Sequence, residues 1–374
     1  MIITSTPFRI SFFGGGTDYP IWYREHGGSV FSTTIDKSCY LSCRHLPPFF
    51  EYHSRISYSK VENVGRNDAI EHPSVRACLQ FLNITEGVEI HHVADLPART
   101  GLGTSSAFTV GLLLALYALK NQMRDKRALA NEAIHIERDL LQEAVGAQDQ
   151  VSAAYGGLNR IDFGSDGAID VRRIVASPSR LADLEQHLAL YFTGFSRTAS
   201  EIAQEQLRVT PHKKRELETM LELVDEGEAI LADGNRRLEE FGKLLHTGWQ
   251  IKRSLTQKIS SSEIDEIYEA GLGAGAIGGK LLGAGGGGFM LFYVNPERRE
   301  ELRTRLKKLL CVPFSFSTLG SRVIVYEPEG QYEEALANDR DSIYGSNSSA
   351  TTEPRRPALQ PLENALQKEI IETK

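Results

Sequence analysis

Residues 95–111, DLPARTGLGTSSAFTVG, hold two close glycines and three consecutive hydroxyl residues ahead of a long apolar segment. Glycines let backbone N–H groups approach a ligand closely, because they lack a Cβ and readily adopt positive φ. The first turn of a helix leaves about four N–H groups unpaired and carries a partial positive charge. Gly101 and Gly103, followed by Thr104, Ser105 and Ser106, therefore predict an anion site at a helix start, most often one for phosphate.

A simpler interpretation is that one of the three hydroxyls merely caps the helix. A single hydroxyl suffices for a cap, and that interpretation leaves glycine at both 101 and 103 unexplained. The hydroxyls could equally donate to phosphate oxygens or ligate a hard cation. The stretch is not a Walker loop, because no Gly-Lys-Ser/Thr follows it.

Two acidic residues further along have surroundings that suit chemistry. Glu137 falls within the apolar stripe of an amphipathic helix expected over 126–145, where a carboxylate without a partner is costly. It is either a partly exposed residue at the edge of the stripe or a metal ligand. Asp149 is the only charged residue between Glu143 and Arg160. That isolation suits either a helix cap or a catalytic carboxylate, and the sequence leaves both open.

Two further stretches are rich in glycine, like residues 95–111. In PFRISFFGGGTD at 7–18, a strand with alternating apolar residues places Arg9 on its polar face and runs into a glycine turn. In KLLGAGGGGF at 280–289, three glycines match the spacing G-x-G-x-x-G. We reject a dinucleotide fingerprint there, because that motif follows a strand and opens a helix, whereas these glycines precede a strand.

Length and composition narrow the class of protein. A chain of 374 residues exceeds a comfortable single core, which predicts two domains. The net charge of −7 argues against nucleic acid or an anionic membrane as the main partner. The N-terminus lacks the pattern of a signal peptide, and no apolar run approaches the ~20 residues that span a bilayer. With four cysteines and no C-x-x-C pair, we expect a cytoplasmic protein with reduced thiols.

The order of expected elements gives the domain organisation. Alternating and apolar segments predict strands near 8–12, 29–44 and 88–94 in a first domain over 1–185. A second domain over 186–335 has a strand near 187–193, helices across 199–206, 213–233, 235–251 and 262–270, a strand at 289–294, a helix at 296–310 and strands near 312–316 and 322–326. This order is typical of a split β-α-β sandwich. Residues 336–374 read as a flexible linker followed by a short amphipathic helix.

The three glycine-rich stretches, in this order and spacing, resemble the three motifs of the GHMP kinases, a family that includes galactokinase, homoserine kinase and mevalonate kinase. The resemblance covers roughly residues 1–330, and the middle motif is the most specific. PFRISFFGGGTDYP and HGGSVFSTTIDK are similar to the branch of D-glycero-D-manno-heptose 7-phosphate kinases. Fucokinase-like sugar 1-kinases are the neighbouring branch.

The resemblance implies a fold and an activity. The fold is α+β, with an N-terminal domain like ribosomal protein S5 domain 2, a ferredoxin-like C-terminal domain and the active site between them. The activity is ATP- and Mg²⁺-dependent phosphorylation of the C1 hydroxyl of D-glycero-α-D-manno-heptose 7-phosphate, in nucleotide-activated heptose biosynthesis. The alternatives are another sugar 1-kinase, of the fucokinase or galactokinase kind, or a non-catalytic sugar or nucleotide sensor on the same fold. A homodimer is possible.

The resemblance also implies a role for each motif residue. Asp149 would take or orient the proton of the sugar hydroxyl, with Arg9 beside it and near the transferred phosphoryl group. Ser106 and Glu137 would hold Mg²⁺. The ATP loop would comprise Pro97, Arg99, Gly101, Leu102, Gly103, Thr104, Ser105, Ser106 and Ala107. The substrate contacts would come from Gly15, Gly16, Thr17, Asp18, Gly285 and Gly286, with Arg197 and Lys280 as candidate cations for a phosphate already on the sugar.

Overall fold

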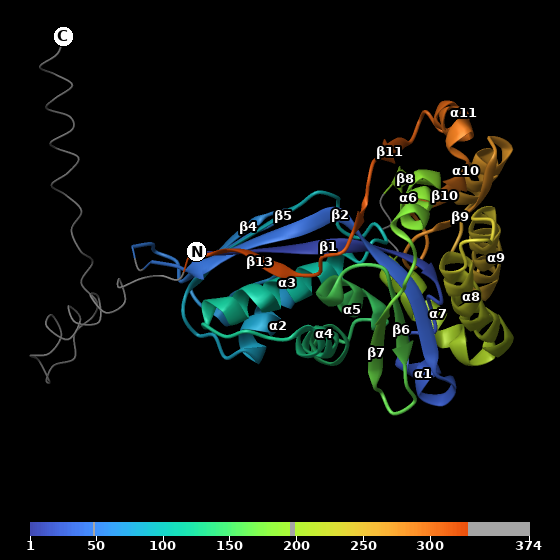
Figure 1. Cartoon of the computed structure of the whole chain (residues 1–374). Coiled ribbons are helices and arrows are strands. Elements are labelled where there is room, and N and C mark those ends of the chain that lie inside the picture. The colour runs from blue at the N-terminus through green and yellow to red at the C-terminus, as the bar shows by residue number, and fades with distance from the viewer. Residues whose placement is uncertain (48, 195–198, 328–374) are drawn as a thin grey trace, which may run out of the picture. The chain divides into compact units, whose positions relative to one another are not determined.

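Two sheets with their helices make up the computed structural model, which describes residues 1–47, 49–194 and 199–327 (Figure 1). We call the nine-stranded sheet with its helices the first lobe, and the four-stranded sheet with its helices the second lobe. The described residues of both lobes belong to one compact unit. The predictions for Arg197 and for the C-terminal linker and helix lie outside the described residues.

The first lobe is built on two long antiparallel strands, β1 (Ile2–Phe13) and β2 (Gly28–His45). The sheet runs β13-β1-β2-β5-β3-β4, with β12 and β6 also pairing with β2 and β7 pairing with β6. Among the strands that the structure describes, β3 and β5 are the one pair that runs parallel. The remaining strands are β3 (Ser54–Ser57), β4 (Val61–Val64), β5 (Val88–Ala94), β6 (Asn159–Phe163), β7 (Ile169–Arg173), β12 (Phe316–Ser317) and β13 (Arg322–Tyr326).

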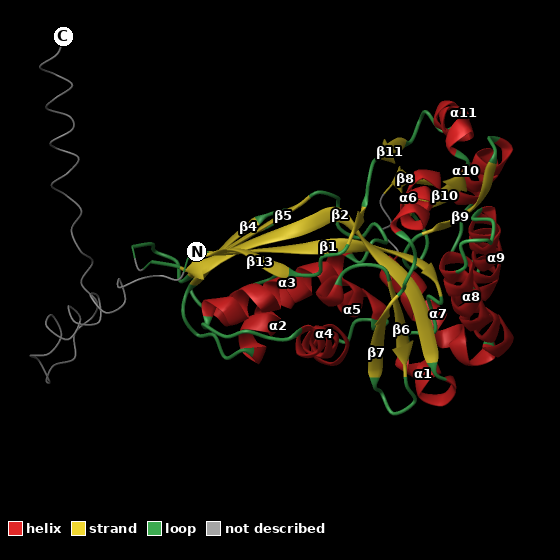
Figure 2. Ribbon diagram, in the orientation of Figure 1, coloured by secondary structure: helices red, strands yellow, loops and turns green. Residues whose placement is uncertain are grey.

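Helices of the first lobe cover one face of β1 and β2, as Figure 2 shows. The central one is α3 (Thr104–Leu119), in which every residue except Ser105 and Leu119 is buried. A helix that is apolar all round must lie inside the protein, which explains its long run of Leu and Ala. The other helices are α1 (Pro20–His26), η1 (Asn67–Ala69), α2 (Pro73–Phe81), α4 (Lys126–Ile134), the π-helix η2 (His135–Leu140) and α5 (Gln148–Tyr155).

The second lobe has an antiparallel sheet in the order β11-β8-β10-β9, as in the ferredoxin-like domain that the resemblance implies. Helix α9 (Glu239–Leu255) packs on β9 (Ala276–Leu281), and α8 (Lys214–Ala232) packs on α9. The other elements are α6 (Pro178–His187), β8 (Leu188–Gly194), α7 (Ala199–Val209), η3 (Thr210–His212), α10 (Ser262–Gly273), β10 (Gly288–Val294), η4 (Pro296–Arg298), α11 (Arg299–Arg305) and β11 (Leu310–Val312).

Aromatic side chains join the two lobes. The ring of Phe241 on α9 lies 5.0 Å from that of Phe13 and 5.3 Å from that of Phe12, both at the end of β1. All three are buried. Such edge-on pairs add about 0.5–1.5 kcal/mol each beyond the area that they bury. The contact fixes the end of β1 against the first turn of α9.

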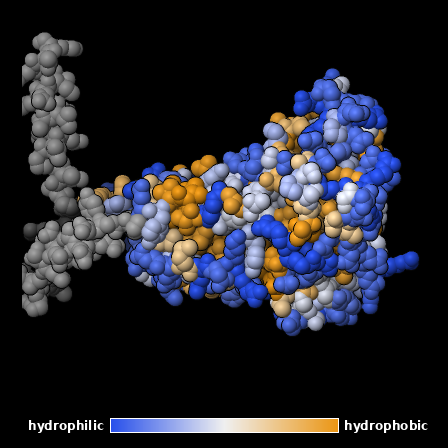
Figure 3. Space-filling model, viewed as in Figure 1, coloured by the Kyte–Doolittle hydropathy of each residue, from blue (hydrophilic) through white to orange (hydrophobic). Residues whose placement is uncertain are grey.

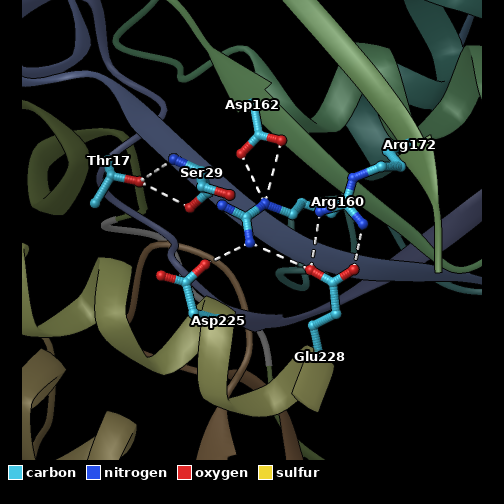
Figure 4. A network of polar contacts seen from close by, with 7 residues as sticks. All are labelled: Thr17, Ser29, Arg160, Asp162, Arg172, Asp225 and Glu228. Carbon is cyan, nitrogen blue, oxygen red and sulfur yellow. Dashed lines mark hydrogen bonds and ion pairs between the residues drawn. The ribbon is translucent and has the colours of Figure 1, made fainter. Parts of the chain in front are cut away.

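An ion-pair network also crosses between the lobes (Figure 4). Arg160 on β6 donates to Asp162 of its own strand at 2.8 Å and to Asp225 on α8 at 2.5 Å. Glu228 on α8 accepts from Arg172 on β7 and lies 3.2 Å from Arg160. Because Arg160 pairs with carboxylates of both lobes and Arg172 of the first lobe pairs with Glu228 of the second, the network opposes separation of the lobes.

Four sequence predictions need correction. The helix expected over 126–145 changes to the wider π-turn at His135 and ends at Leu140, because an i→i+5 turn leaves no trace in the apolar spacing. The helix expected over 296–310 ends at Arg305, and that expected over 235–251 lies at 239–255. Residues 316–326, placed in the second domain, pair instead with β2 and β1, so the chain returns to the first lobe.

The surface of the described residues is mixed in character. On the face drawn in Figure 3, hydrophilic residues are interspersed with smaller hydrophobic patches. Within the described ranges, none of the helices combines the length and the apolar character needed to cross a membrane.

Candidate active site

A cleft of about 500 Å³ lies between the lobes. Its walls come from both lobes. The first lobe contributes β1, the turn after it, the loop before α3 and the start of α5. The second lobe contributes α7, α9, β9 and the glycine loop between β9 and β10.

The two glycine loops touch at one end of the cleft. Gly101 has φ +84°, and a Cβ built on it would lie 2.3 Å from the carbonyl oxygen of Leu282. A Cβ on Gly283 would lie 2.3 Å from the Cα of Gly101. Only glycine fits at both positions, so the ATP loop predicted from the sequence is held in backbone contact with the second lobe.

The hydroxyls at the start of α3 do not cap it. Gly103 is the N-cap residue, in the left-handed region, and no side chain caps the helix. Thr104 Oγ1 accepts the N–H of Arg99 at 3.1 Å, and Ser106 Oγ donates to Glu137 at 2.8 Å. The capping interpretation is therefore wrong, and the helix start keeps N–H groups for a ligand in the cleft.

Glu137 lies behind this helix start and is fully buried, so the partly exposed alternative is excluded. Its Oε2 accepts from Ser106 and from Gln150, whereas its Oε1 has no hydrogen-bond partner among the described residues. Burial raises the pKa of Glu137 to about 7, against the opposing hydrogen bonds of Ser106 and Gln150. The side chain projects from the π-helix η2, a type of turn often found at functional sites.

Arg9 and Asp149 form a two-pronged ion pair at the cleft. Arg9 Nε donates to Asp149 Oδ1 at 2.7 Å, and Nη2 donates to Oδ2 at 2.9 Å. The third guanidinium nitrogen, Nη1, donates to the carbonyl of Gly101 at 2.7 Å. Arg9 is almost fully buried, while the Asp149 side chain is 26% exposed. The carboxylate therefore faces the cleft and is oriented from behind.

The turn after β1 gives a second carboxylate. Asp18 lines the cleft, and its oxygens accept the N–H groups of Gly16 at 3.0 Å and Gln148 at 3.3 Å. Burial raises the pKa of Asp18. Two polar atoms beside it, Ser11 Oγ and Gln148 Oε1, have no hydrogen-bond partner among the described residues, and both residues line the cleft.

Thr17, predicted as a substrate contact, is not in the cleft wall. Its hydroxyl bonds to the carbonyls of Gly14 and Ser29 at 2.8 and 2.9 Å and accepts the N–H of Ser29 at 3.1 Å. Figure 4 shows the two contacts with Ser29. Thr17 is fully buried and holds the turn in shape. The prediction of a ligand contact rested only on its being a polar residue next to Asp18.

The structure sorts the other predicted residues as follows. The cleft wall contains Arg9, Gly15, Gly16, Asp18, Arg99, Gly101, Gly103, Thr104, Ser105, Ser106, Asp149, Lys280 and Gly285. Among described residues, those predicted for the site but outside its wall are Pro97, Leu102, Ala107, Thr17, Glu137 and Gly286. Leu102 is buried, and its carbonyl accepts the N–H of Arg9 at 3.0 Å.

Sequence reasoning missed several cleft residues, of which Lys252 is the most prominent. It lies on the buried stripe of α9 with Phe241, Leu245 and Trp249, at spacings of three and four. A charged residue on an apolar stripe is the same signal that singled out Glu137, so it was available in the sequence. Also missed were Ser11, Gln148, Ser200, Ala203, Gln204 and Gln206.

Comparisons with known proteins agree with this arrangement. Residues 71–157 match the GHMP kinases N terminal domain, and residues 201–310 match the GHMP kinases C terminal domain. The chain is 31% identical to the D-glycero-alpha-D-manno-heptose 7-phosphate kinase of Campylobacter jejuni, over 82% of this chain and 93% of the relative. It is 27% identical to the bifunctional fucokinase/GDP-fucose pyrophosphorylase of Arabidopsis thaliana, over 81% of this chain and 31% of that larger protein.

Solved structures share the fold. A D-glycero-D-manno-heptose 1-phosphate kinase from Bacteroides thetaiotaomicron superimposes with a TM-score of 0.65 at 24% identity, covering 87% of this chain and all of that one. Galactokinase of Lactococcus lactis, complexed with galactose, gives 0.66 at 17% identity, covering 86% of this chain and 94% of that one.

The contact between the glycine loops predicts the outcome of Gly101→Ala. The new Cβ would meet Leu282 and displace the loop, so we expect ATP affinity to fall at least about tenfold. A left-handed residue other than glycine also strains the backbone, which should lower the free energy of unfolding by ~1–3 kcal/mol. Calorimetric titration with ATP and thermal melting measure the two effects.

Gly167→Ala is the matched control. Its φ of +88° imposes similar backbone strain, but nothing lies within 4 Å of the new Cβ. We expect a similar loss of stability with unchanged ATP affinity. Equal ATP affinity in both variants would show that the loop contact does not shape the nucleotide site.

Proposed function

We propose, from the premise that this chain belongs to the GHMP kinases, that it transfers the γ-phosphoryl group of ATP to the C1 hydroxyl of D-glycero-α-D-manno-heptose 7-phosphate. GHMP kinases are ATP-dependent enzymes, and this chain is a phosphotransferase with an alcohol group as acceptor. The product would be the 1,7-bisphosphate, and the step would serve the synthesis of nucleotide-activated heptose. The Campylobacter relative bears the name of this activity. Location in the cytoplasm and assembly as a homodimer stay predictions from the sequence.

One observation carries the proposal: the cleft holds a fixed carboxylate next to an open helix N-terminus. A Cβ on Gly103, the N-cap of α3, would lie 3.4 Å from the Asp149 carboxylate and 3.1 Å from Arg9. A phosphate bound at the helix start is therefore adjacent to a group that can receive a proton. Phosphoryl transfer needs this juxtaposition, because its catalysis consists mainly of positioning and charge stabilisation.

The chemistry follows from these contacts. The sugar hydroxyl would donate a hydrogen bond to the exposed edge of the Asp149 carboxylate. It would lose its proton there as its oxygen attacks the γ-phosphorus, while the bond from that phosphorus to the β-phosphate oxygen breaks and ADP leaves. Arg9 holds the carboxylate in place through both oxygens and lies next to the loop that binds the phosphates. The N–H groups at the start of α3 would take up charge on the phosphate oxygens.

Three further groups in the cleft wall suit a phosphorylated sugar. Ser11 Oγ and Gln148 Oε1 are buried polar atoms without partners, and sugar hydroxyls would satisfy both. Lys280 is buried in the wall and uses one N–H, to the carbonyl of Phe12 at 2.8 Å. Burial, with the charges of Lys252 and Arg9, lowers the pKa of Lys280, and an anionic ligand would reverse this effect. Lys280 therefore supports a substrate that already carries a phosphate.

Ser106 and Glu137 fit a magnesium ion. The unpartnered Oε1 of Glu137 is a buried anionic oxygen that a cation would satisfy. In the described ranges no three His, Cys, Asp or Glu residues cluster. Mg²⁺ needs no such cluster, because it commonly binds through one or two carboxylates together with phosphate oxygens. When bound, the ion would neutralise charge on the β- and γ-phosphates.

A substrate panel tests the proposed acceptor. ATP consumption is measured with heptose 7-phosphate, mannose 6-phosphate, fucose and galactose, and phosphorus NMR identifies the product as an anomeric phosphate. We expect kcat/KM for heptose 7-phosphate to exceed that for the free sugars by about 100-fold or more, because they leave a buried cation unpaired. Faster turnover of a free sugar would instead indicate a fucokinase- or galactokinase-like enzyme. Binding without turnover of any sugar would indicate a sensor.

Asp149→Asn tests the acceptor acid. The amide keeps the size of the side chain but cannot take up the proton, so we expect kcat to fall at least ~100-fold. ATP affinity should stay within about threefold, because the loop N–H groups remain. Asp183→Asn on α6 serves as the surface control. Turnover by Asp149→Asn near the wild-type rate would remove Asp149 from the mechanism.

Glu137→Gln tests the metal site. Gln keeps the hydrogen bond of Ser106 but loses the anionic oxygen, so we expect the Mg²⁺ concentration for half-maximal binding, measured by calorimetry with a non-hydrolysable ATP analogue, to rise about tenfold or more. Asp139→Asn in the same π-helix is the control, because that side chain is exposed and pairs with His135. If both variants bind Mg²⁺ alike, Glu137 is a structural residue only.

A further inference from the structure

Lys252 brings a positive charge from the second lobe to the acids of the first. It projects from α9 into the cleft wall and is only 6% exposed. Its Nζ donates to the carbonyl of Gly283, in the loop that touches Gly101. The ammonium is therefore next to the point where the two glycine loops meet.

The charges around Lys252 belong to the phosphoryl-transfer groups. Asp18 and Asp149 attract the ammonium from the first lobe, while Arg9 on β1 and Lys280 on β9 repel it. Within the described part of the chain, no carboxylate lies within ion-pair distance of Lys252, and its one hydrogen bond is to a carbonyl. An ammonium has three donors, so two remain for a ligand.

A buried cation without an ion pair is unfavourable for a merely structural lysine. Desolvating an ammonium costs several kcal/mol unless it is paired, and a carbonyl hydrogen bond repays only part of that cost. Three buried cations, Arg9, Lys252 and Lys280, share this cleft with Asp18 and Asp149. An anion placed between Arg9 and Lys252 would relieve the repulsion between these two cations. Because Asp149 attracts Lys252 and the Gly283 carbonyl holds it beside the contact of the two loops, that anion would be the transferred group.

We infer that Lys252 is a further catalytic residue, whose ammonium contacts the phosphoryl group during transfer, an inference that rests on the proposed kinase function. The second lobe thereby supplies a cation opposite the Arg9–Asp149 pair. The ammonium would interact most strongly with the phosphoryl group in the transition state, when that group lies between the nucleotide and the sugar oxygen. A cation in this position stabilises the charge on the equatorial oxygens.

The protonation of Lys252 gives the inference a pH signature. Burial, together with the charge of Arg9, lowers the pKa of Lys252 to about 8, against the attraction of Asp18 and Asp149. The ammonium is charged below that pH and neutral above it. Because kcat/KM reports ionisations of the free enzyme, it should fall as the pH rises through about 8.

The experiment compares Lys252→Met and Lys252→Arg with the wild type, using the sugar that the wild type phosphorylates fastest. For the Met variant we expect kcat to fall about 100-fold, with KM for both substrates within about threefold, as for loss of a group that acts in the transition state. The Arg variant should recover at least about a tenth of the activity and lose the fall in kcat/KM near pH 8, because arginine stays charged. Lys243→Met, an exposed lysine on the same helix, should match the wild type.

Three outcomes would overturn the inference. One is a Met variant with kcat within about threefold of the wild type. Another is a rise in the KM of the sugar at unchanged kcat, which would mean that Lys252 binds the phosphate already on the sugar. The third is a lowered melting temperature with lost ATP binding in both variants, which would mean that Lys252 only holds the Gly283 loop. A wild type inert towards every sugar would overturn the proposed function, and this inference with it.

Discussion

The guanidinium of Arg9 is the contact on which the geometry of the cleft depends. It donates to both oxygens of Asp149 and to the carbonyl of Gly101, so one planar group positions the acid, the ATP loop and the strand that carries it. Arginine suits this role because its donors form a rigid fork, whereas lysine is a flexible point charge. Arg9 stands on β1, where its backbone pairs with Thr34 of β2 and its N–H donates to the carbonyl of Leu102. The sheet and the loop before α3 together thereby hold the groups proposed to perform the transfer.

Both lobes contribute charged groups to the cleft wall. The first lobe provides Asp18, Asp149 and the helix N-terminus, whereas the second provides Lys252 and Lys280. Buried cations of this kind lower the stability of the ligand-free protein. Two sets of contacts between the lobes restore stability. They are the packing of Phe241 on Phe12 and Phe13 and the ion pairs of Arg160 and Arg172. The buried charges of the cleft thus lower the stability of the protein, and packing elsewhere compensates for that loss. Functional sites commonly lower stability in this way.

Much of the site was predictable because its signals are local. Glycine spacing marks the two loops, and a carboxylate on an apolar stripe marks Glu137, whose burial the structure confirms. Lys252 carries the same signal, but the other charged residues of α9 obscure the apolar stripe in the sequence. Thr17 misled because a residue's place beside a functional acid does not reveal where its hydroxyl points. The π-turn and the return of β13 to β1 depend on backbone and long-range pairing, which apolar spacing does not encode.

The return of the chain to its first strand has a consequence for synthesis. Strand β1 gains β13 as its second neighbour only after the whole second lobe has been translated. At about 5–20 residues per second, the ribosome leaves β1 with an open edge for many seconds. An unpaired edge is a template for other strands, so the nascent chain is most prone to aggregate during that interval. Arg9 is therefore among the first residues to be translated, yet the strand that carries it gains its second neighbour only near the end of synthesis.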